Sequence, residues 1–313
     1  MDVQSPSELV LPALARAGGA LSPEAVAALI RHPRFPDAMR AVLSENVRLY
    51  KGNRILNHVG YDRGRLVTTI LAFYLHVVRE PGDPTSGLTA QRLKSLCVEQ
   101  DVCSPGRARA MLSLLRLFGY VAAAAADDRR FKRLEPTALL IASLRQRWAR
   151  MFEAVAMMLP EGEAARACLD RDDFLAAFVR KVVDHYRGGL RALQFTPELK
   201  PFAERNAGLT ILFSLVIAGE PDDAMPPTRP VRIAISELAR RFSVSRAHVL
   251  RLLREAVAEG LIARTGSAQE AVTLLPPLSR ALQQSAAIVF LFFAHCAREA
   301  LAEIGRDTAT VAG

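Results

Sequence analysis

Basic side chains gather on two segments of this 313-residue chain, at spacings that predict the solvent-facing sides of helices. A guanidinium can contact a phosphate or donate two hydrogen bonds to a guanine. We therefore take these side chains as candidate nucleic-acid contacts. A solvated charged face is the alternative interpretation, because charge on an exposed helix surface is ordinary. The candidates are Ser104, Arg107, Arg109, Ser113 and Arg116 in the first segment, and Ser245, Arg246, His248, Arg251 and Arg254 in the second.

The stretch that follows the first basic segment contains five consecutive alanines, Ala122 to Ala126. Gly119 precedes them and is typical of the left-handed position that ends a helix. We therefore predict a β-hairpin, with residues 120–126 as the outgoing strand, Asp127–Arg130 as the tip and residues 131–136 as the return strand. Because alanine is the best helix former, a helix that continues through these alanines is the alternative.

Four cations fall at the tip and in the return strand of this predicted hairpin. Four positive charges within five residues repel one another unless a bound anion offsets them. The cluster therefore favours an anionic partner over a role in solubility alone. Its members are Arg129, Arg130, Lys132 and Arg133, whereas the corresponding hairpin of the second segment offers only Arg264.

The second basic segment shows most clearly which elements would hold these side chains. We predict a short helix, a turn at residues 243–244 and a second helix capped by Ser245, because a serine there accepts a bond from first-turn N–H groups. Gly260 ends that helix, and residues 261–263 and 271–275 form a hairpin. The predicted core positions are Leu238 and Ala239 on the short helix, then Val249, Leu252, Leu253 and Ala256 on the second.

The first basic segment repeats this order of signals. Ser104 is the predicted cap, and Pro105 occupies the first helical position, where its missing N–H is not needed. Gly119 ends the helix, as Gly260 does in the second segment. The predicted buried face of this helix is Ala108, Met111, Leu112 and Leu115.

The whole chain carries the pattern twice. Thr69-Ile70-Leu71 recurs as Thr210-Ile211-Leu212, 141 residues later, and both the capping serines and the helix-ending glycines keep that offset. A repeated order at a fixed offset indicates an internal duplication. We predict two copies, residues 1–160 and 161–313, with helix-pair units at about 62–138 and 206–278. About thirty N-terminal residues lie outside the repeat, and the fold class is mainly α with small β-hairpins.

Each copy resembles a protomer of the MarR family of bacterial transcription regulators. The matching residues are Ser104 to Gly119, the "DDRR" of Asp127–Arg130 and the "LEPTALL" that begins at Leu134. The resemblance implies a winged helix-turn-helix, in which the second helix enters the major groove and an arginine-bearing wing contacts the minor groove. Two features depart from the family pattern: the second copy lacks the basic wing, and the segment 89–104 is long for one helix and a turn.

The family binds DNA as a two-fold homodimer through flanking dimerisation-type helices. The resemblance therefore implies that the duplicated chain is a pseudo-dimer with pseudo-two-fold symmetry, monomeric in solution. Residues 148–159 and 286–294 would be its paired central helices; alternatively, each is core of its own copy. The resemblance also implies room for a small-molecule effector, although no residue identifies one.

Little in the sequence supports catalysis, a cofactor or a metal. Phosphate-loop, dinucleotide-binding, zinc-protease and hydrolase motifs do not occur. The six histidines are dispersed, and His295 has a carboxylate one helical turn away, at Glu299. Two ligands fall short of a zinc site, so we expect a helix-surface hydrogen bond there. The four cysteines form no CxxC pair and are typical of buried side chains in a reducing cytosol.

The bulk properties agree with an anionic partner. The formal net charge is +9 and the sequence pI is about 9.9, although frequent use of arginine in place of lysine is an alternative reason. We see no signal peptide, and the apolar run 286–294 is too short to span a bilayer, so we expect a cytoplasmic protein.

These observations together favour a sequence-specific transcription regulator that binds double-stranded DNA. A replication-initiator-like protein is the first alternative, because such proteins also place two winged helices in one chain. A winged-helix protein-interaction scaffold is the second. The basic charge argues against the scaffold, which has no need of a basic wing.

Overall fold

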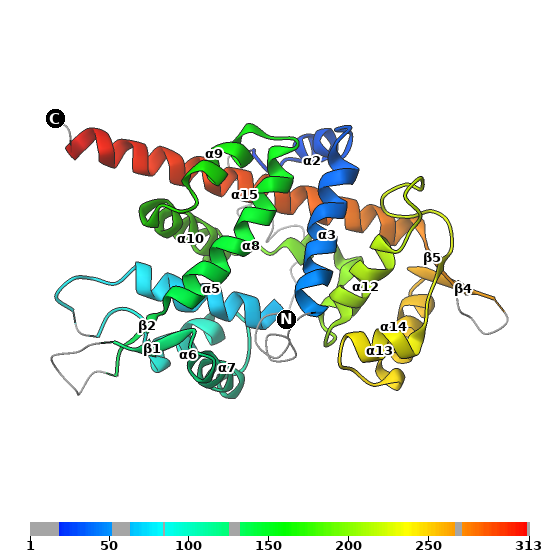
Figure 1. Ribbon diagram of the computed structural model, residues 1–313, viewed down its shortest axis with the longest axis horizontal. Coiled ribbons are helices and arrows are strands. Elements are labelled where there is room, and N and C mark those ends of the chain that lie inside the picture. Colours follow the sequence, from blue (N-terminus) through cyan, green and yellow to red (C-terminus); the bar gives the residue numbers. More distant parts are fainter. Residues whose placement is uncertain (1–18, 52–62, 84, 125–131, 267–270, 312–313) are drawn as a thin grey trace, which may run out of the picture.

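The computed structural model describes residues 19–51, 63–83, 85–124, 132–266 and 271–311. These residues form a mainly helical body with two small antiparallel sheets, as the sequence predicts. The long helix α15 (Pro276–Val311) runs along one edge of the body. Two lobes lie at opposite ends of the other edge, one with α6 and α7 and one with α13 and α14 (Figure 1).

The two halves of the chain present their elements in the same order. The first half contains α2 (Pro23–Ile30), α3 (Phe35–Lys51), α5 (Arg63–Val77), α6 (Ala90–Glu99), α7 (Pro105–Leu117), β1 (Val121–Ala123), β2 (Leu134–Pro136) and α8 (Ala138–Ala156). The second half contains α9 (Pro160–Cys168), α10 (Asp172–Arg187), η1 (Ala192–Gln194), η2 (Pro197–Leu199), α11 (Lys200–Ala203), α12 (Gly208–Ile217), β3 (Val231–Arg232), α13 (Ile235–Arg241), α14 (Arg246–Ala258), β4 (Ile262–Thr265), β5 (Ala271–Leu274) and α15.

The ends of α7 and α14 follow from local chemistry, and both predictions are confirmed. The hydroxyl oxygens of Ser104 and Ser245 accept bonds from first-turn N–H groups, at 3.4 and 3.0 Å. Gly119 and Gly260 end the helices at φ +72° and +67°, in the left-handed region that glycine adopts without strain. The predicted core positions of both helices are buried. Each helix therefore packs on the body through the face that carries its predicted core residues.

Both predicted hairpins form. β1 pairs with β2 from Val121 to Ala123, so the alanines there belong to a strand rather than to a continued helix. Residues 125–131, which include the predicted tip Asp127–Arg130 and the adjoining ends of the predicted strands, lie outside the described residues. In the second half β4 pairs with β5, and β3 adds a third strand that the sequence did not suggest. A single bridge between Thr89 and Arg133 takes the place of that third strand in the first half.

The hydrophobic residues form two main cores, and each core draws on both halves of the chain. The first contains α12, α13, α14 and the beginning of α15, together with α2 and α3 from the other half. The second contains α5, α6, α7 and most of α8, together with α10 and the later part of α15. Neither predicted copy therefore contains a complete core of its own.

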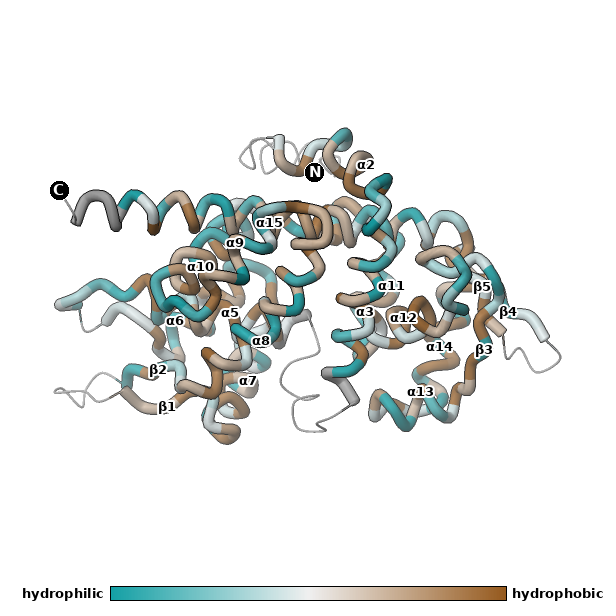
Figure 2. Tube along the Cα trace, turned by 45° about the horizontal axis from the view of Figure 1, so that its top comes forward, coloured by the Kyte–Doolittle hydropathy of each residue, from teal (hydrophilic) through white to brown (hydrophobic). Residues whose placement is uncertain are grey.

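The exchange of helices between the halves is reciprocal. α3, from the first half, packs against α12, from the second, while α10, from the second half, packs against α5, from the first. α12 is hydrophobic along almost its whole length and lies beside α3 (Figure 2). The helices α8 and α15, which contain the predicted central segments 148–159 and 286–294, also contact one another.

The N-terminal helix α2 corrects one expectation. We expected about thirty N-terminal residues outside the repeat, yet α2 packs against α15. Its counterpart α9 packs against α8 and α15, and both helices begin with Pro-Glu, at Pro23 and Pro160. The two short helices thus hold corresponding places in the element order and both pack on α15, although they share little sequence beyond that dipeptide.

The apolar run 286–294 belongs to a much longer helix than we expected. The segment Pro276–Arg306 of α15 is long and apolar enough to cross a membrane, judged by length and composition alone. In this structure its buried residues, from Leu278 to Ile304, contribute to both cores, and none of residues 286–294 is exposed. The helix serves here as the common spine of the two lobes.

Candidate nucleic-acid interface

The helices α7 and α14 lie in the two lobes on the same side of the body, away from α15 (Figure 1). At 3.6 residues per turn, Arg109, Ser113 and Arg116 fall on the side of α7 turned away from its buried residues, and all three are exposed. Ser104 and Arg107 are exposed near its start. The predicted candidates of α7 are therefore on the surface.

On α14, Arg251 and Arg254 project from the centre of the exposed face, and Arg246 is exposed in the first turn. The equivalent positions of α7 hold Ala110 and Ser113. The two outward faces thus differ although the buried faces match. The candidate helices present unlike surfaces on one side of the molecule.

His248 does not face outward as we expected. Its ring is half-buried, and its Nε2 lies 2.9 Å from the backbone carbonyl oxygen of Asn206, between α11 and α12. Its Nδ1 lies 3.5 Å from a nitrogen of Arg251. His248 therefore anchors α14 to the body and holds one side of Arg251, instead of offering both ring nitrogens to a partner.

The hairpin cations divide into three groups. Arg129 and Arg130 lie outside the described residues, and Lys132 is exposed. Arg133 is half-buried in the bridge to Thr89, and its Nε is buried without a hydrogen-bond partner in the described part of the chain. Arg264 is also half-buried, opposite Val272 in the sheet. Arg133 and Arg264 are therefore only partly accessible, whereas the predicted tip with Arg129 and Arg130 lies outside the described residues.

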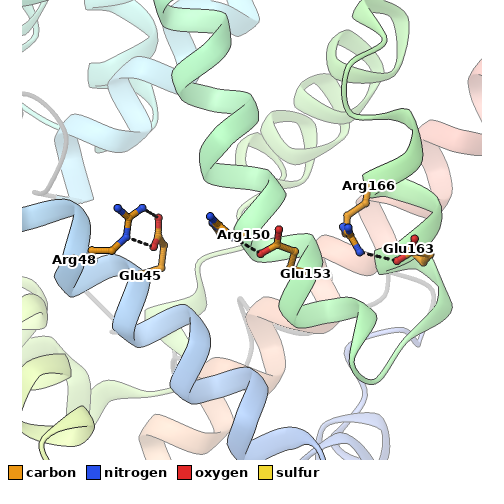
Figure 3. Close-up of polar contacts among 6 residues, drawn as sticks. All are labelled: Glu45, Arg48, Arg150, Glu153, Glu163 and Arg166. Carbon is orange, nitrogen blue, oxygen red and sulfur yellow. Dashed lines mark hydrogen bonds and ion pairs between the residues drawn. The ribbon is translucent and has the colours of Figure 1, made fainter.

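Several surface arginines elsewhere have carboxylate partners. Figure 3 shows three such pairs on α3, α8 and α9: Arg48 with Glu45 at 2.6 Å, Arg150 with Glu153 at 2.8 Å and Arg166 with Glu163 at 2.9 Å. Others are Arg34 with Asp37, Arg171 with Asp173, Arg229 with Asp222 and Arg298 with Glu161.

Five exposed arginines of the candidate helices lack such partners among the described residues. α7 contains no acidic residue, and the only one in α14, Glu255, bonds to Arg205 at 2.8 Å. Among the described residues, no carboxylate lies within ion-pair distance of the following side chains: Arg109, Arg116, Arg246, Arg251 and Arg254. Uncompensated exposed cations on one side of a molecule attract polyanions.

A polar cavity of about 450 Å³ lies between the two lobes. Arg107 of α7 lines it from one lobe, Arg205 and Asn206 line it from the other, and Tyr186 from the end of α10 lies between them. The guanidinium of Arg191 stacks 3.4 Å over the Tyr186 ring and bonds to Gln100 at the end of α6. The cavity thus adjoins the start of α7.

The comparisons with known proteins name no relative. No protein-family model, no curated protein and no solved structure matches this chain.

Proposed function

We propose that the protein is a sequence-specific regulator of transcription that binds double-stranded DNA through two winged helix-turn-helix units of MarR type. In this proposal α7 and α14 are the recognition helices, the hairpins β1–β2 and β4–β5 are the wings, and the chain is a monomeric pseudo-dimer. The observation that carries it is the set of exposed arginines, Arg109, Arg116, Arg246, Arg251 and Arg254, that have no carboxylate partner among the described residues and lie on two helices on one side of the body. The reciprocal packing of α3 on α12 and of α10 on α5 supports the pseudo-two-fold relation.

The position of the cavity between the lobes is compatible with the small-molecule effector that the family resemblance implies. A small molecule bound by Arg107 and Arg205 would contact the start of one recognition helix and the loop that anchors the other. Asp101 and Glu204 line the cavity together with these two arginines, so its lining offers both charges. Binding of an effector there would alter the relative placement of the two helices.

A salt titration with matched variants tests the DNA proposal. One variant replaces Arg109, Arg116, Arg251 and Arg254 with Ala; the control replaces the paired arginines Arg34, Arg48, Arg150 and Arg166 with Ala. Both variants lose four charges, so general attraction falls equally. We expect the first variant to lose duplex affinity and to flatten the plot of log affinity against log salt by about 0.9 for each lost phosphate contact, while the control keeps most of both.

Equal losses of duplex affinity in the two variants would show that the binding is non-specific charge attraction. Wild-type protein that binds no duplex at low salt would instead favour the interaction scaffold. Genome-wide mapping of bound sites separates the remaining alternatives, because a regulator occupies promoters whereas an initiator occupies a repeat array at an origin.

A further inference from the structure

Three potential metal ligands meet where α10 packs against α15. His295 and Glu299 lie one turn apart on α15, and His185 comes from the last turn of α10. The Nε2 atom of His185 lies 2.9 Å from one oxygen of Glu299, and the Nε2 atom of His295 lies 3.6 Å from the other. One ligand atom of each residue lies within 4.8 Å of the other two.

This geometry corrects the sequence analysis, which counted only two ligands at this place. The third, His185, is 110 residues from His295 along the chain. The sequence analysis missed His185 because helical spacing relates only residues within one helix, and the repeat offset relates only equivalent positions of the two copies. Only the packing of α10 on α15 brings His185 to the pair.

The surroundings of the cluster leave one ring nitrogen without a partner. The side chains of His185 and His295 are each only 12% exposed. The Nε2 atom of His295 is buried, and no hydrogen-bond partner reaches it among the described residues. A buried polar atom without a partner costs free energy, which a bound ion would recover. The Phe292 ring packs edge-on against His185, 5.8 Å between centroids, and restricts its rotation.

We propose that His185, His295 and Glu299 form a binding site for a divalent transition metal of the zinc type. Two imidazoles and one carboxylate are a ligand set that zinc accepts, and three protein ligands leave a fourth position for water or an exogenous ligand. Bonds of about 2.0–2.1 Å in a tetrahedral site place ligand atoms about 3.3 Å apart. The two nitrogen–oxygen spacings, 2.9 and 3.6 Å, bracket that value but involve different oxygens of Glu299, so side-chain rotation must bring the three ligand atoms, now within 4.8 Å of one another, around one ion.

The position of the site gives a bound metal a structural consequence. Asp184 and Arg187, which flank His185 on α10, bond to the hydroxyl of Tyr74 on α5 at 3.2 and 2.9 Å. Glu299 and His295 belong to the spine helix α15. A metal would therefore tie the spine to the segment of α10 that holds the first lobe. This inference does not depend on the proposed DNA binding.

Metal titration of the full chain, after chelation and dialysis, tests the site. We expect one equivalent of Zn²⁺ to bind and to raise the melting temperature, because a ligand that binds only the folded state stabilises it. Co²⁺ should give the visible absorption of a tetrahedral complex, whereas Mg²⁺, which prefers octahedral oxygen sites, should not compete. His295→Gln and Glu299→Gln should each weaken Zn²⁺ binding at least tenfold.

The control His32→Gln, which alters a histidine before α3, should bind Zn²⁺ as the wild type does. A measurement without variants is the ring ¹H–¹⁵N spectrum, in which Zn²⁺ should shift two of the six histidines. Absence of saturable binding, unchanged affinity in both Gln variants, or shifts of other histidines would overturn the proposal. The three side chains would then form only a hydrogen-bonded cluster.

Discussion

Under the proposed function, Arg251 and Arg254 would free this chain from a constraint that applies to DNA-binding homodimers. A homodimer must present identical outward faces and so reads a palindrome. Here the positions equivalent to Arg251 and Arg254 on α7 are Ala110 and Ser113. The buried residues of the two helices match, so the helices stay similar as folding units while their surfaces differ.

We predict that Arg251→Ala relaxes base preference in one half of the DNA site only. If its guanidinium makes a two-point contact with guanine, the loss is about 1–3 kcal/mol. Selection of binding sites from a random pool, before and after the substitution, measures this directly. The paired Arg150 supplies the control, since Arg150→Ala should leave the selected sequence unchanged.

A wild-type consensus that is a perfect inverted repeat, equally constrained in both halves, would contradict this prediction. The differences between α7 and α14 would then be surface drift without consequence for recognition.

At this scale the sequence predicts local interactions well and long-range ones poorly. The capping bonds of Ser104 and Ser245 span three residues, so the residue type and its neighbours determine them. His248 instead bonds to Asn206, 42 residues away, and Arg133 bridges to Thr89. The directions of the His248 and Arg133 side chains depend on tertiary packing, which the helical and strand periodicity of the sequence does not encode.

At the scale of elements, the loop between α12 and β3 depends on a single carboxylate. Asp223 accepts bonds from the hydroxyl and N–H of Thr228, at 2.7 and 3.0 Å, and from the N–H groups of Arg229 and Ala224, at 2.9 and 2.8 Å. The Thr228 hydroxyl and the Arg229 N–H lower the pKa of Asp223 to about 2.

We predict that Asp223→Asn lowers the melting temperature at neutral pH and that this difference disappears in acid. Because the folded-state pKa lies below the unfolded value of about 3.9, the charged carboxylate stabilises the fold fully above that value. The contribution is lost as the pH falls through about 2. Melting curves of both proteins between pH 7 and pH 2 measure this, with the exposed Asp170→Asn as control. A constant difference over the whole range would contradict it.

Gly162 makes a second prediction for an element. A Cβ at this buried position of α9 would lie 2.2 Å from the backbone nitrogen of Ala156, at the end of α8. Gly162→Ala must push α9 away from α8, which we expect to destabilise the fold by about 1–3 kcal/mol. A Cβ at Gly305 of α15 meets open space, so Gly305→Ala should be neutral or gain up to about 1 kcal/mol. Chemical denaturation compares the two; equal stabilities would contradict the close approach.

The elements themselves were largely predictable, and the reasons are physical. Gly119 stopped α7, so the alanines after it entered a strand in spite of their helix propensity. The strand β3 was not predicted because its two residues are too few to show the alternation of apolar and polar side chains that is typical of a strand. The correspondence of α2 and α9 was not found because the two helices share little sequence beyond their first two residues.

The arrangement of the whole molecule could not be read from the repeat. An offset of 141 residues states which segments are equivalent, not which copy an element packs against. α3 covers α12 of the other half, and α10 covers α5 in return. The boundary near residue 160 therefore separates two sequence copies without separating two cores.

We predict that this exchange makes the halves interdependent. Fragments 1–158 and 159–313, cut in the turn between α8 and α9, each lose part of their core. Without α3, which contributes Met39 and Leu43 to the same core, the α12 side chains Ile211 and Leu215 lose part of the apolar surface that buries them. Exposed apolar surface of this kind favours association or aggregation. Expressed alone, each fragment should therefore show no cooperative unfolding as a monomer.

Expressed together, the fragments should purify as a one-to-one complex that melts cooperatively, because every contact between the halves except the single chain connection is preserved. Light scattering should give the mass of one intact chain for both this complex and the uncut protein. A fragment that is monomeric and unfolds cooperatively by itself would show that its copy completes a core without the other. In that case the packing of α3 on α12 would be an addition to two independent units, and the duplicated chain would behave as two tethered domains instead of one interleaved fold.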